Sequence, residues 1–309
     1  PGDPPGDPDY VVGVDGGASG CRALALDLHG RELGKATGPP ARIDPSNPGA
    51  AAGAVTETVV GAMRVAGREP PARTLWMGLA GAGRARAREA VEIALRSERL
   101  ALKARVCMDV EVAHWDAFQS GPGFILVVGT GSMVWGRDPE GVTVRVGGWG
   151  NPLSEEGSGY WLGLEGLRAV VRAADHRDPP TLLTAALLKL LHLEDPSALV
   201  SWVAQATKRE VGALAPTVLK LAAQGDPAAE RIQHRGLEAL ALHLAVVKRA
   251  WAPWGDPFPL ALSGGLLSEG APFREPVMGL ARELGAELYT EPVVPVRGAA
   301  RLALSAVSA

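Results

Sequence analysis

The chain of 309 residues is poor in cysteine: it holds only Cys21 and Cys107, each inside or beside a predicted strand. Two isolated cysteines cannot by themselves form a tetrahedral zinc site or a four-thiolate iron–sulfur cluster. We therefore expect two buried, inert thiols. The chain also lacks the Gly-x4-Gly-Lys-Ser/Thr phosphate loop, the Gly-x-Gly-x-x-Gly dinucleotide fingerprint, the His-Glu-x-x-His motif and any Cys-x-x-Cys pair. These absences exclude the protein classes that those motifs define.

Charge and hydropathy give no sign of a nucleic-acid or membrane partner. The net charge is −3, and no uninterrupted apolar stretch is long enough to span a bilayer. The first residues lack the basic-then-apolar pattern of a signal peptide, so we expect a cytoplasmic protein. Hydrophobic residues make up 47% and charged residues 21%, which is ordinary for a globular chain long enough for two domains.

Three glycine-rich turns are the most informative feature that is present. They are Asp15-Gly-Gly-Ala-Ser-Gly20, Gly129-Thr-Gly-Ser132 and Ser263-Gly-Gly-Leu-Leu267, and each follows an apolar run that predicts a strand. Glycines at the end of a strand let backbone N–H groups approach an anionic ligand that side chains would otherwise exclude. The three turns together predict a nucleotide-binding site, in which two turns bind phosphate groups and one binds the nucleoside.

Two aspartates end predicted strands, and each has a structural alternative. Asp15 is suited to partner Mg²⁺ near a phosphate, usually through waters, but it also suits an Asx-type cap of its tight turn. Asp109, after the strand at 104–108, could take the proton from an attacking hydroxyl in phosphoryl transfer. Its alternative is the N-cap of a helix that starts at Val110, with Glu111 in the first turn. One oxygen can cap while the other faces a substrate.

Two loops are open to the same kind of double interpretation. The turn at 129–132 offers flexible backbone donors and two hydroxyls for a β- or γ-phosphate, or it is a simple hairpin turn. The stretch from Gly147 to Trp161 combines Glu155, Glu156, an indole and five glycines, which suits a polyol ligand. Its alternative is a structural loop that ends in a Ser158 helix cap.

The order of predicted elements indicates a mixed α/β architecture. Residues 1–9 are rich in proline and glycine and predict a mobile tail, and both halves then open with a strand, a glycine turn and a second strand. This similarity is a weak internal repeat. From Ser158 to Trp251 the spacing of apolar residues is helical, with expected breaks at 178–180, 195–196 and 225–227.

Taken together, the motifs resemble the sugar-kinase/Hsp70/actin superfamily, and more closely the BadF/BadG/BcrA/BcrD group, whose best-understood branch is N-acetylglucosamine kinase. The matching segments are Gly13–Gly17 with Arg22, Met108-Asp109, Gly129–Ser132, Gly147–Gly150, Glu156–Trp161, Ser263–Gly265 and Pro295–Ala299. The resemblance implies two ribonuclease H-like domains with a nucleotide and sugar cleft between them. It divides the chain into a tail (1–9), an N-terminal domain (10–118) and a C-terminal domain (119–296) with a helical insertion (158–252). The terminal helix, about 297–309, is expected to pack back on the first domain.

The resemblance also assigns roles. Asp109 would be the general base that activates a sugar hydroxyl, Asp15 the partner of Mg²⁺, and ATP would be held by the glycine turns. The expected ATP contacts are Gly16, Gly17, Ser19, Gly129, Thr130, Gly131, Ser132, Gly264 and Gly265. The expected sugar contacts are Asp109, Trp149, Gly150, Glu155 and Glu156.

Three departures from the group's pattern concern the ligand sites. The first turn reads Ala-Ser-Gly-Cys over 18–21 where relatives commonly carry Gly-Thr-Lys-Thr, and the group's Gly-Asp-Glu-Gly-Ser is Ser-Glu-Glu-Gly-Ser over 154–158. The loop that supplies a sugar-binding asparagine in the group does not align, so Asn47 or Asp44 substitutes for it or the contact is lost.

The sequence supports three functional hypotheses. The first is an ATP-dependent kinase of an amino sugar, N-acetylglucosamine or glucosamine, with ATP and Mg²⁺ as cofactors and a homodimer as a plausible state. The second is an ATPase that activates a radical dehydratase or reductase through an iron–sulfur cluster, for which Cys21 and Cys107 are poorly placed. The third is a nucleotide or sugar sensor without catalysis, which the altered first turn and Glu155 would favour.

Overall fold

The computed structural model describes residues 8–44, 46–151 and 153–307. Most of the predicted tail, residues 1–7, lies outside the described residues. Within these ranges the chain forms two compact units, one of residues 8–121 with 291–307 and one of residues 122–290.

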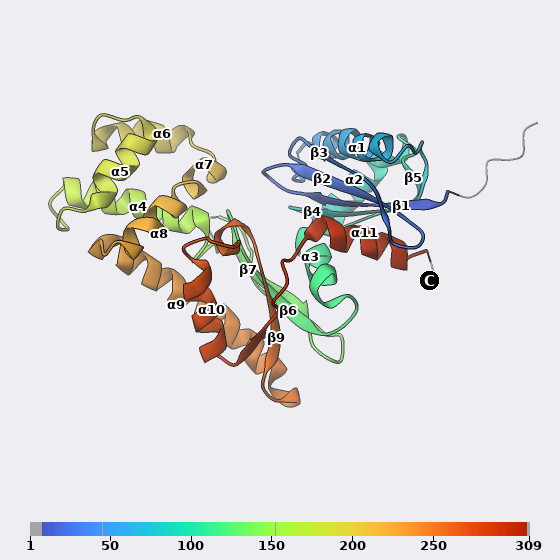
Figure 1. Ribbon diagram of the computed structural model, residues 1–309. Coiled ribbons are helices and arrows are strands. Elements are labelled where there is room, and N and C mark those ends of the chain that lie inside the picture. The colour runs from blue at the N-terminus through green and yellow to red at the C-terminus, as the bar shows by residue number, and fades with distance from the viewer. Residues whose placement is uncertain (1–7, 45, 152, 308–309) are drawn as a thin grey trace, which may run out of the picture. The chain divides into compact units, whose positions relative to one another are not determined.

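The first unit is a five-stranded mixed sheet with helices on both faces (Figure 1). Its strands are β1 Tyr10–Gly16, β2 Cys21–Asp27, β3 Glu32–Gly38, β4 Ala72–Leu79 and β5 Ala101–Met108. Its helices are α1 Pro48–Val65, α2 Ala85–Arg96, α3 Asp109–Phe118 and α11 Pro295–Ser305. The strand order is β3-β2-β1-β4-β5, in which β1 is antiparallel to β2 and parallel to β4, and β4 is parallel to β5.

The apolar run of β1 follows from its central place in this sheet. Val12 and Val14 are fully buried in the cluster that includes α1, whereas Val11 is buried on the opposite face against α11. A strand covered on both faces needs a continuous apolar sequence rather than an alternating one. Gly13 is required by the close approach of α11, because a Cβ there would lie 2.0 Å from the backbone N of Ala300. Helices α1 and α2 lie on one side of the sheet, and α3 and α11 lie on the other (Figure 1).

A buried carboxylate joins α11 to α3. Asp116 of α3 accepts hydrogen bonds at 2.6 and 2.7 Å from the Arg297 guanidinium and one at 2.7 Å from the backbone N–H of Val294. Gly298 allows the two helices to approach, since a Cβ there would lie 2.0 Å from the carbonyl oxygen of Val112. These contacts fix the C-terminal helix beside the helix that begins at Asp109.

The second unit repeats the strand order of the first. Its strands are β6 Gly123–Val128, β7 Ser132–Arg137, β8 Thr143–Gly147, β9 Phe258–Ser263 and β10 Ala286–Leu288. They are arranged β10-β9-β6-β7-β8, so β6, β7, β8, β9 and β10 stand where β1 to β5 stand in the first sheet. The weak internal repeat seen in the sequence is therefore a true repeat of topology, and the α/β fold class is confirmed.

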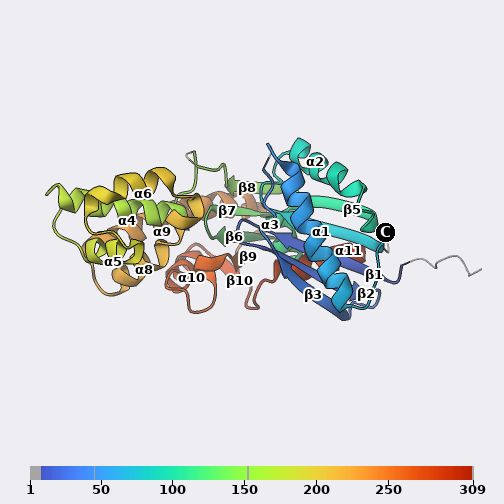
Figure 2. The same cartoon turned by 90° about the horizontal axis from the view of Figure 1, so that it is seen from above.

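Helices make up most of the remaining second unit (Figure 2). They are α4 Gly159–Ala174, α5 Leu182–Leu191, α6 Leu199–Gln205, α7 Lys208–Gly212, α8 Ala215–Ala223, α9 Pro227–Trp251 and α10 Arg274–Glu283. The three expected breaks are confirmed, and the structure adds a break at 206–207, which no proline marks, and one at 213–214, where Pro216 lies in the first turn of α8. Thr207 explains the first, because its hydroxyl and Glu210 form a capping box that starts α7.

Both cysteines are buried and unpaired, as expected. Cys21 lies in β2 and Cys107 in β5, and burial raises the pKa of the Cys21 thiol to about 11 and that of Cys107 still further. Neither thiol is an accessible thiolate at neutral pH. Within the described ranges, no helix combines the length and apolar character that crossing a bilayer requires.

Candidate functional site

Two carboxylates lie at one edge of the first sheet. Asp15 stands near the end of β1, and Asp109 follows β5 directly. Both strands run parallel to β4, which lies between them, so their carboxyl ends meet at the same edge of the sheet. Burial, together with the negative charge of Asp109, raises the pKa of Asp15 to about 6, and the Arg22 guanidinium at 4.0 Å offsets this only in part.

Asp109 is a carboxylate held in a poorly solvated position. Burial raises its pKa, although a 3.0 Å hydrogen bond from the N–H of Val110 and the charge of Arg42 act in the opposite direction. The interpretation of Asp109 as the N-cap of the helix is wrong, since α3 begins at Asp109 itself. Glu111 caps this end of the helix instead, because its Oε1 accepts a 2.9 Å hydrogen bond from the N–H of Met108. Asp109 contributes to the first turn of α3 through the hydrogen bond that its Oδ1 accepts from the N–H of Val110.

The first glycine turn borders a hollow of about 380 Å³, lined by Asp15, Gly17, Ser19, Arg22 and Thr37 among others. The turn is closed by a 2.9 Å hydrogen bond from the N–H of Gly17 to the carbonyl of Gly20. Ser19 is exposed at its tip. Gly16 has a packing reason of its own, because a Cβ there would lie 2.6 Å from the Leu79 side chain.

The second glycine turn is the bend of the β6–β7 hairpin, as its structural alternative predicted. The turn is also tied to the start of α4, where the N–H groups of Gly159 and Tyr160 donate to the carbonyls of Gly129 and Thr130 at 2.8 and 3.2 Å. Its outer side therefore keeps backbone N–H groups rather than carbonyls available to a ligand. In the described part of the chain, the N–H groups of Thr130 and Gly131 donate to no acceptor.

Ser132 links the second turn to the two glutamates. Its N–H donates to Glu155 Oε2 at 3.1 Å, and its hydroxyl donates to the backbone carbonyl of Glu156 at 2.7 Å. Gly131 makes room for the carboxylate, because a Cβ there would lie 2.5 Å from Glu155 Oε2. Ser132, expected as an ATP contact, and Glu155, expected as a sugar contact, are thus hydrogen-bonded to each other.

The third glycine turn lies against the second. Gly264 has φ +99°, and a Cβ there would lie 2.3 Å from the carbonyl oxygen of Val128 at the end of β6. Gly129 and Gly265 are correspondingly close, with 3.9 Å between the Cβ position of the first and the backbone N of the second. The structure therefore brings together the second and third turns, which are separated by about 130 positions of sequence.

The loop from Gly147 to Ser158 presents Trp149 to solvent with 72% of its surface exposed. The Arg145 guanidinium lies 5.4 Å from the centre of the indole ring and donates to the carbonyl of Gly148 at 2.6 Å. Gly150 pairs with Ser154 in an isolated bridge, and the Ser158 hydroxyl accepts a 3.2 Å hydrogen bond from the N–H of Trp161. The predicted Ser158 helix cap is confirmed, and the loop is anchored at both ends.

Sequence reasoning missed His243, which lies behind this loop on α9. Its imidazole lies within 3.2 Å of the Cβ position of Gly147, and its buried Nδ1 has no hydrogen-bond partner among the described residues. Burial lowers the pKa of His243, and the charge of Glu156 acts against this. Helical periodicity could have placed His243 only on one side of α9, since its contact with Gly147 is made between segments far apart in the sequence.

The two expected substitutes for a sugar-binding asparagine both have local partners. Asn47 caps α1, accepting a hydrogen bond from the N–H of Ala50 at 3.3 Å. Asp44 accepts hydrogen bonds from the N–H and hydroxyl of Ser46 at 2.8 and 2.7 Å. Each side chain therefore has a structural role that explains its presence.

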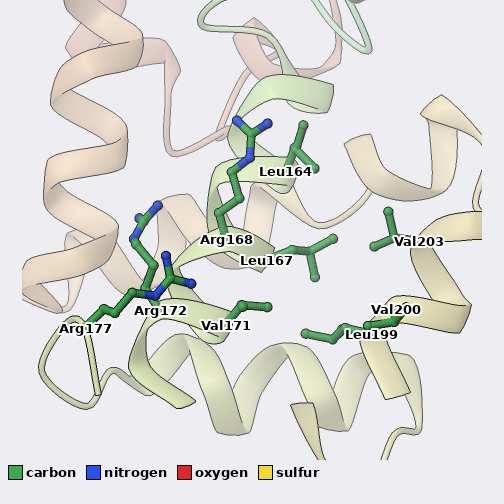
Figure 3. A pocket seen from close by; sticks show the side chains of 9 residues that line it. All are labelled: Leu164, Leu167, Arg168, Val171, Arg172, Arg177, Leu199, Val200 and Val203. Atoms are coloured by element: carbon green, nitrogen blue, oxygen red, sulfur yellow. The ribbon is translucent and has the colours of Figure 1, made fainter. Parts of the chain in front are cut away.

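A second concavity is lined by other residues. Figure 3 shows a groove of about 540 Å³ in the helical part of the second unit, lined by Leu164, Leu167, Arg168, Val171, Arg172, Arg177, Leu199, Val200 and Val203. Its arginines are paired with carboxylates: Arg168 with Glu165 at 2.6 Å, Arg172 with Asp178 at 2.8 Å and Arg177 with Asp175 at 2.6 Å. The groove contains none of the site residues expected from the sequence.

Comparison with known proteins matches nearly the whole chain. The family model of the BadF/BadG/BcrA/BcrD ATPase family matches residues 12–303. An N-acetylmuramic acid/N-acetylglucosamine kinase of Clostridium acetobutylicum is 28% identical over 262 residues, which are 84% of this chain and 86% of that protein. An N-acetyl-D-glucosamine kinase of Dictyostelium discoideum is 28% identical over 314 residues, or 96% of this chain and 98% of that protein.

Solved structures agree with this match. A candidate N-acetylglucosamine kinase from Chromobacterium violaceum superimposes with a TM-score of 0.81 at 28% identity, covering 96% of this chain and 99% of that one. A ROK family glucokinase from Streptomyces griseus, solved with glucose and AMPPNP, gives a TM-score of 0.58 at 17% identity, with 96% and 99% covered. The fold is that of the actin-like sugar kinases.

Proposed function

Because the chain belongs to the BadF/BadG/BcrA/BcrD ATPase family, we propose that it is an ATP-dependent kinase of an amino sugar, N-acetylglucosamine or glucosamine. The observation that carries this proposal is the pair Asp15 and Asp109 at one sheet edge, in a chain whose relatives are named as amino sugar kinases. A carboxylate with a raised pKa is a better proton acceptor, as phosphoryl transfer to a hydroxyl requires.

Asp109 is the proposed general base. Its carboxylate accepts the proton of the sugar hydroxyl as that oxygen forms a bond to the γ-phosphorus of ATP. The bond between the γ-phosphorus and the bridging oxygen breaks, and ADP leaves with the electron pair of that bond. Glu111 satisfies the N–H of Met108, and Asp109 Oδ1 accepts from the N–H of Val110, so one oxygen of Asp109 can serve the helix while the other faces a substrate.

Asp15 is the proposed partner of Mg²⁺, directly or through water. The fit rests on charge: two partly buried carboxylates raise each other's energy at this edge, and Arg22 at 4.0 Å compensates only in part. A hard divalent cation would relieve this repulsion. When bound, Mg²⁺ supplies neutralisation of the charge on the phosphate oxygens.

The glycine turns are the proposed phosphate and nucleoside contacts. In the first unit Gly16, Gly17 and Ser19 would contact the phosphates, and in the second unit Gly129, Thr130, Gly131 and Ser132 would do so. The nearby Gly264 and Gly265 would contact the nucleoside. The unpartnered N–H groups of Thr130 and Gly131 support this role, since consecutive backbone donors form anion-binding concavities. Trp149, Gly150, Glu155 and Glu156 of the second unit are further proposed sugar contacts.

A different observation argues against the second family branch as the function. An ATPase that activates a radical enzyme would need thiolates at an accessible surface to hold an iron–sulfur cluster. Cys21 and Cys107 are 1% and 8% exposed and sit in separate strands. A purified protein free of iron and of visible colour would agree with the kinase, whereas stoichiometric iron would favour the activator.

The direct test is ADP release from Mg·ATP with glucosamine, N-acetylglucosamine, N-acetylmuramic acid, glucose or no sugar. Stimulation by one amino sugar supports the kinase and identifies its acceptor. Turnover that is indifferent to every sugar contradicts it and favours an ATPase. Binding of ATP and a sugar without ADP formation favours the non-catalytic sensor.

A further inference from the structure

In the second glycine turn, a carboxylate of the protein itself accepts a hydrogen bond from a backbone N–H group. Of its three consecutive N–H groups at 130, 131 and 132, the last donates to the carboxylate of Glu155 at 3.1 Å. The carboxylate rests against Gly131, where a Cβ would lie 2.5 Å from Oε2 and 3.3 Å from Cδ. A glycine at this position therefore makes room for the Glu155 side chain as well as for any ligand.

A nucleotide phosphate and this carboxylate exclude each other at the turn. Both are anionic acceptors that seek the same N–H of Ser132, and two like charges at one small concavity repel. The structure also fixes the loop that carries Glu155, because the Ser132 hydroxyl donates to the carbonyl of Glu156 at 2.7 Å. The Glu155 side chain can thus leave the turn by rotation while its backbone stays in place.

We propose that Glu155 is an internal competitor of the nucleotide for the phosphate-binding turn, and that it thereby links nucleotide binding to sugar binding. The inference rests on the proposed kinase function. A sugar hydroxyl offers the carboxylate an alternative hydrogen-bond donor, and a Glu155 held by the sugar releases the Ser132 N–H to the phosphate. By linkage, sugar and nucleotide then strengthen each other's binding to the same extent. ATP would be held weakly when no acceptor is present, which limits hydrolysis by water.

The length of the glutamate side chain makes this testable. Glu155→Asp keeps the charge but shortens the side chain by one methylene, which withdraws the carboxylate from the Ser132 N–H. General repulsion of the nucleotide is kept, while the hydrogen bond that competes with the phosphate is lost. Glu140→Asp, at an exposed turn of the same unit, is the matched control for shortening a glutamate.

The measurement is calorimetric titration with Mg·AMPPNP, with and without N-acetylglucosamine. We expect Glu155→Asp to bind AMPPNP on the order of tenfold more tightly than the wild type without sugar, as for loss of a competing hydrogen bond to a charged group. N-acetylglucosamine should strengthen AMPPNP binding to the wild type and to Glu140→Asp by a similar factor, and should change the Glu155→Asp variant little. Should that variant fail to fold, Glu155→Gln is expected to bind more tightly as well, with Glu140→Gln as its control for one lost charge.

Equal or weaker binding of AMPPNP by Glu155→Asp overturns the competition. The link to the sugar is overturned if the variant binds AMPPNP more tightly but N-acetylglucosamine does not change the affinity of the wild type for AMPPNP. Failure of every protein to bind AMPPNP in either condition refutes the proposed function itself, and this inference with it.

Discussion

The negative charge of Asp109 reaches Asp15 and, after burial, is the second cause that raises the pKa of Asp15 to about 6. The two side chains come from strands that flank β4, and no ion pair closer than the 4.0 Å contact with Arg22 relieves Asp15 in the described part of the chain. This repulsion destabilises the folded protein when no ligand is bound. A bound cation and a hydroxyl that donates its proton would relieve it.

Burial of Asp15 and its repulsion by Asp109 predict a pH dependence of stability that Asp15→Asn should remove. The pKa of Asp15 rises from 3.8 to about 6 on folding, so the folded state binds this proton more tightly than the unfolded state does. The contribution is fully present below pH 3.8 and is lost as the pH rises through 6. The loss amounts to about 3 kcal/mol at 1.36 kcal/mol per pKa unit.

Urea unfolding of the wild type and Asp15→Asn at pH 4 and pH 7 checks this. The variant should gain stability relative to the wild type between the two pH values. A stability difference that does not change with pH would show that Asp15 titrates normally.

The same shift predicts how Mg·ATP binding depends on pH. The ionised form of Asp15 is the one that holds a cation, so the dissociation constant of Mg·ATP should fall as the pH rises through about 6. Asp15→Asn should bind more weakly and lose this dependence. Fluorescence titration from pH 5 to pH 8 measures both effects, and an unchanged pH profile in the variant would remove Asp15 from the cation site.

Gly264 should be irreplaceable for a backbone reason. Gly264→Ala places a Cβ 2.3 Å from the carbonyl oxygen of Val128 at a φ of +99°, whereas a Cβ on Gly265 meets nothing within 4 Å. We expect the first change to lower the free energy of unfolding by at least about 2 kcal/mol and the second to lower it by less than about 1 kcal/mol. Thermal unfolding distinguishes them; equal losses would mean that the contact between the second and third turns is not as described.

The contacts of Asp116 should stabilise the packing of the terminal helix α11. Asp116→Ala removes a fully buried carboxylate that accepts from Arg297 and from the N–H of Val294, and we expect a loss of about 3 to 5 kcal/mol. Arg301 is the matched control, since its contact with Asp116 is 3.4 Å long and its side chain is 46% exposed. Arg301→Ala should lose about 1 kcal/mol or less. Comparable losses in the two variants would contradict a central role for Asp116.

Much of this fold follows from local sequence. The runs that become β1 and β6 are apolar without alternation because both faces of each strand are buried, and each is followed by glycines that permit a tight bend. Proline and aspartate marked three helix breaks correctly. The break before α7 was missed because it depends on a capping box, Thr207 with Glu210, in a stretch without proline or glycine at the cap.

The site was predictable only as a set of candidates. Asp15 and Asp109 end parallel strands, so their shared sheet edge follows from the pattern once the strands are recognised. The role of Asp109 as an N-cap was wrong by one residue, because Glu111 satisfies the N–H of Met108 instead. The contacts of Glu155 with Ser132 and of His243 with Gly147 join segments far apart in the chain, and no local signal encodes them.

The central claim is tested most directly by mass spectrometry of the sugar product, with wild-type protein and Asp109→Asn incubated with Mg·ATP and each amino sugar. The account predicts a hexosamine phosphate from the wild type and a rate lowered by about 10²- to 10⁴-fold in the variant, with a melting temperature that is not lower. A variant that forms product within a few-fold of the wild-type rate would contradict the assignment of Asp109. A wild type that binds Mg·ATP but phosphorylates none of the sugars would contradict the amino sugar kinase.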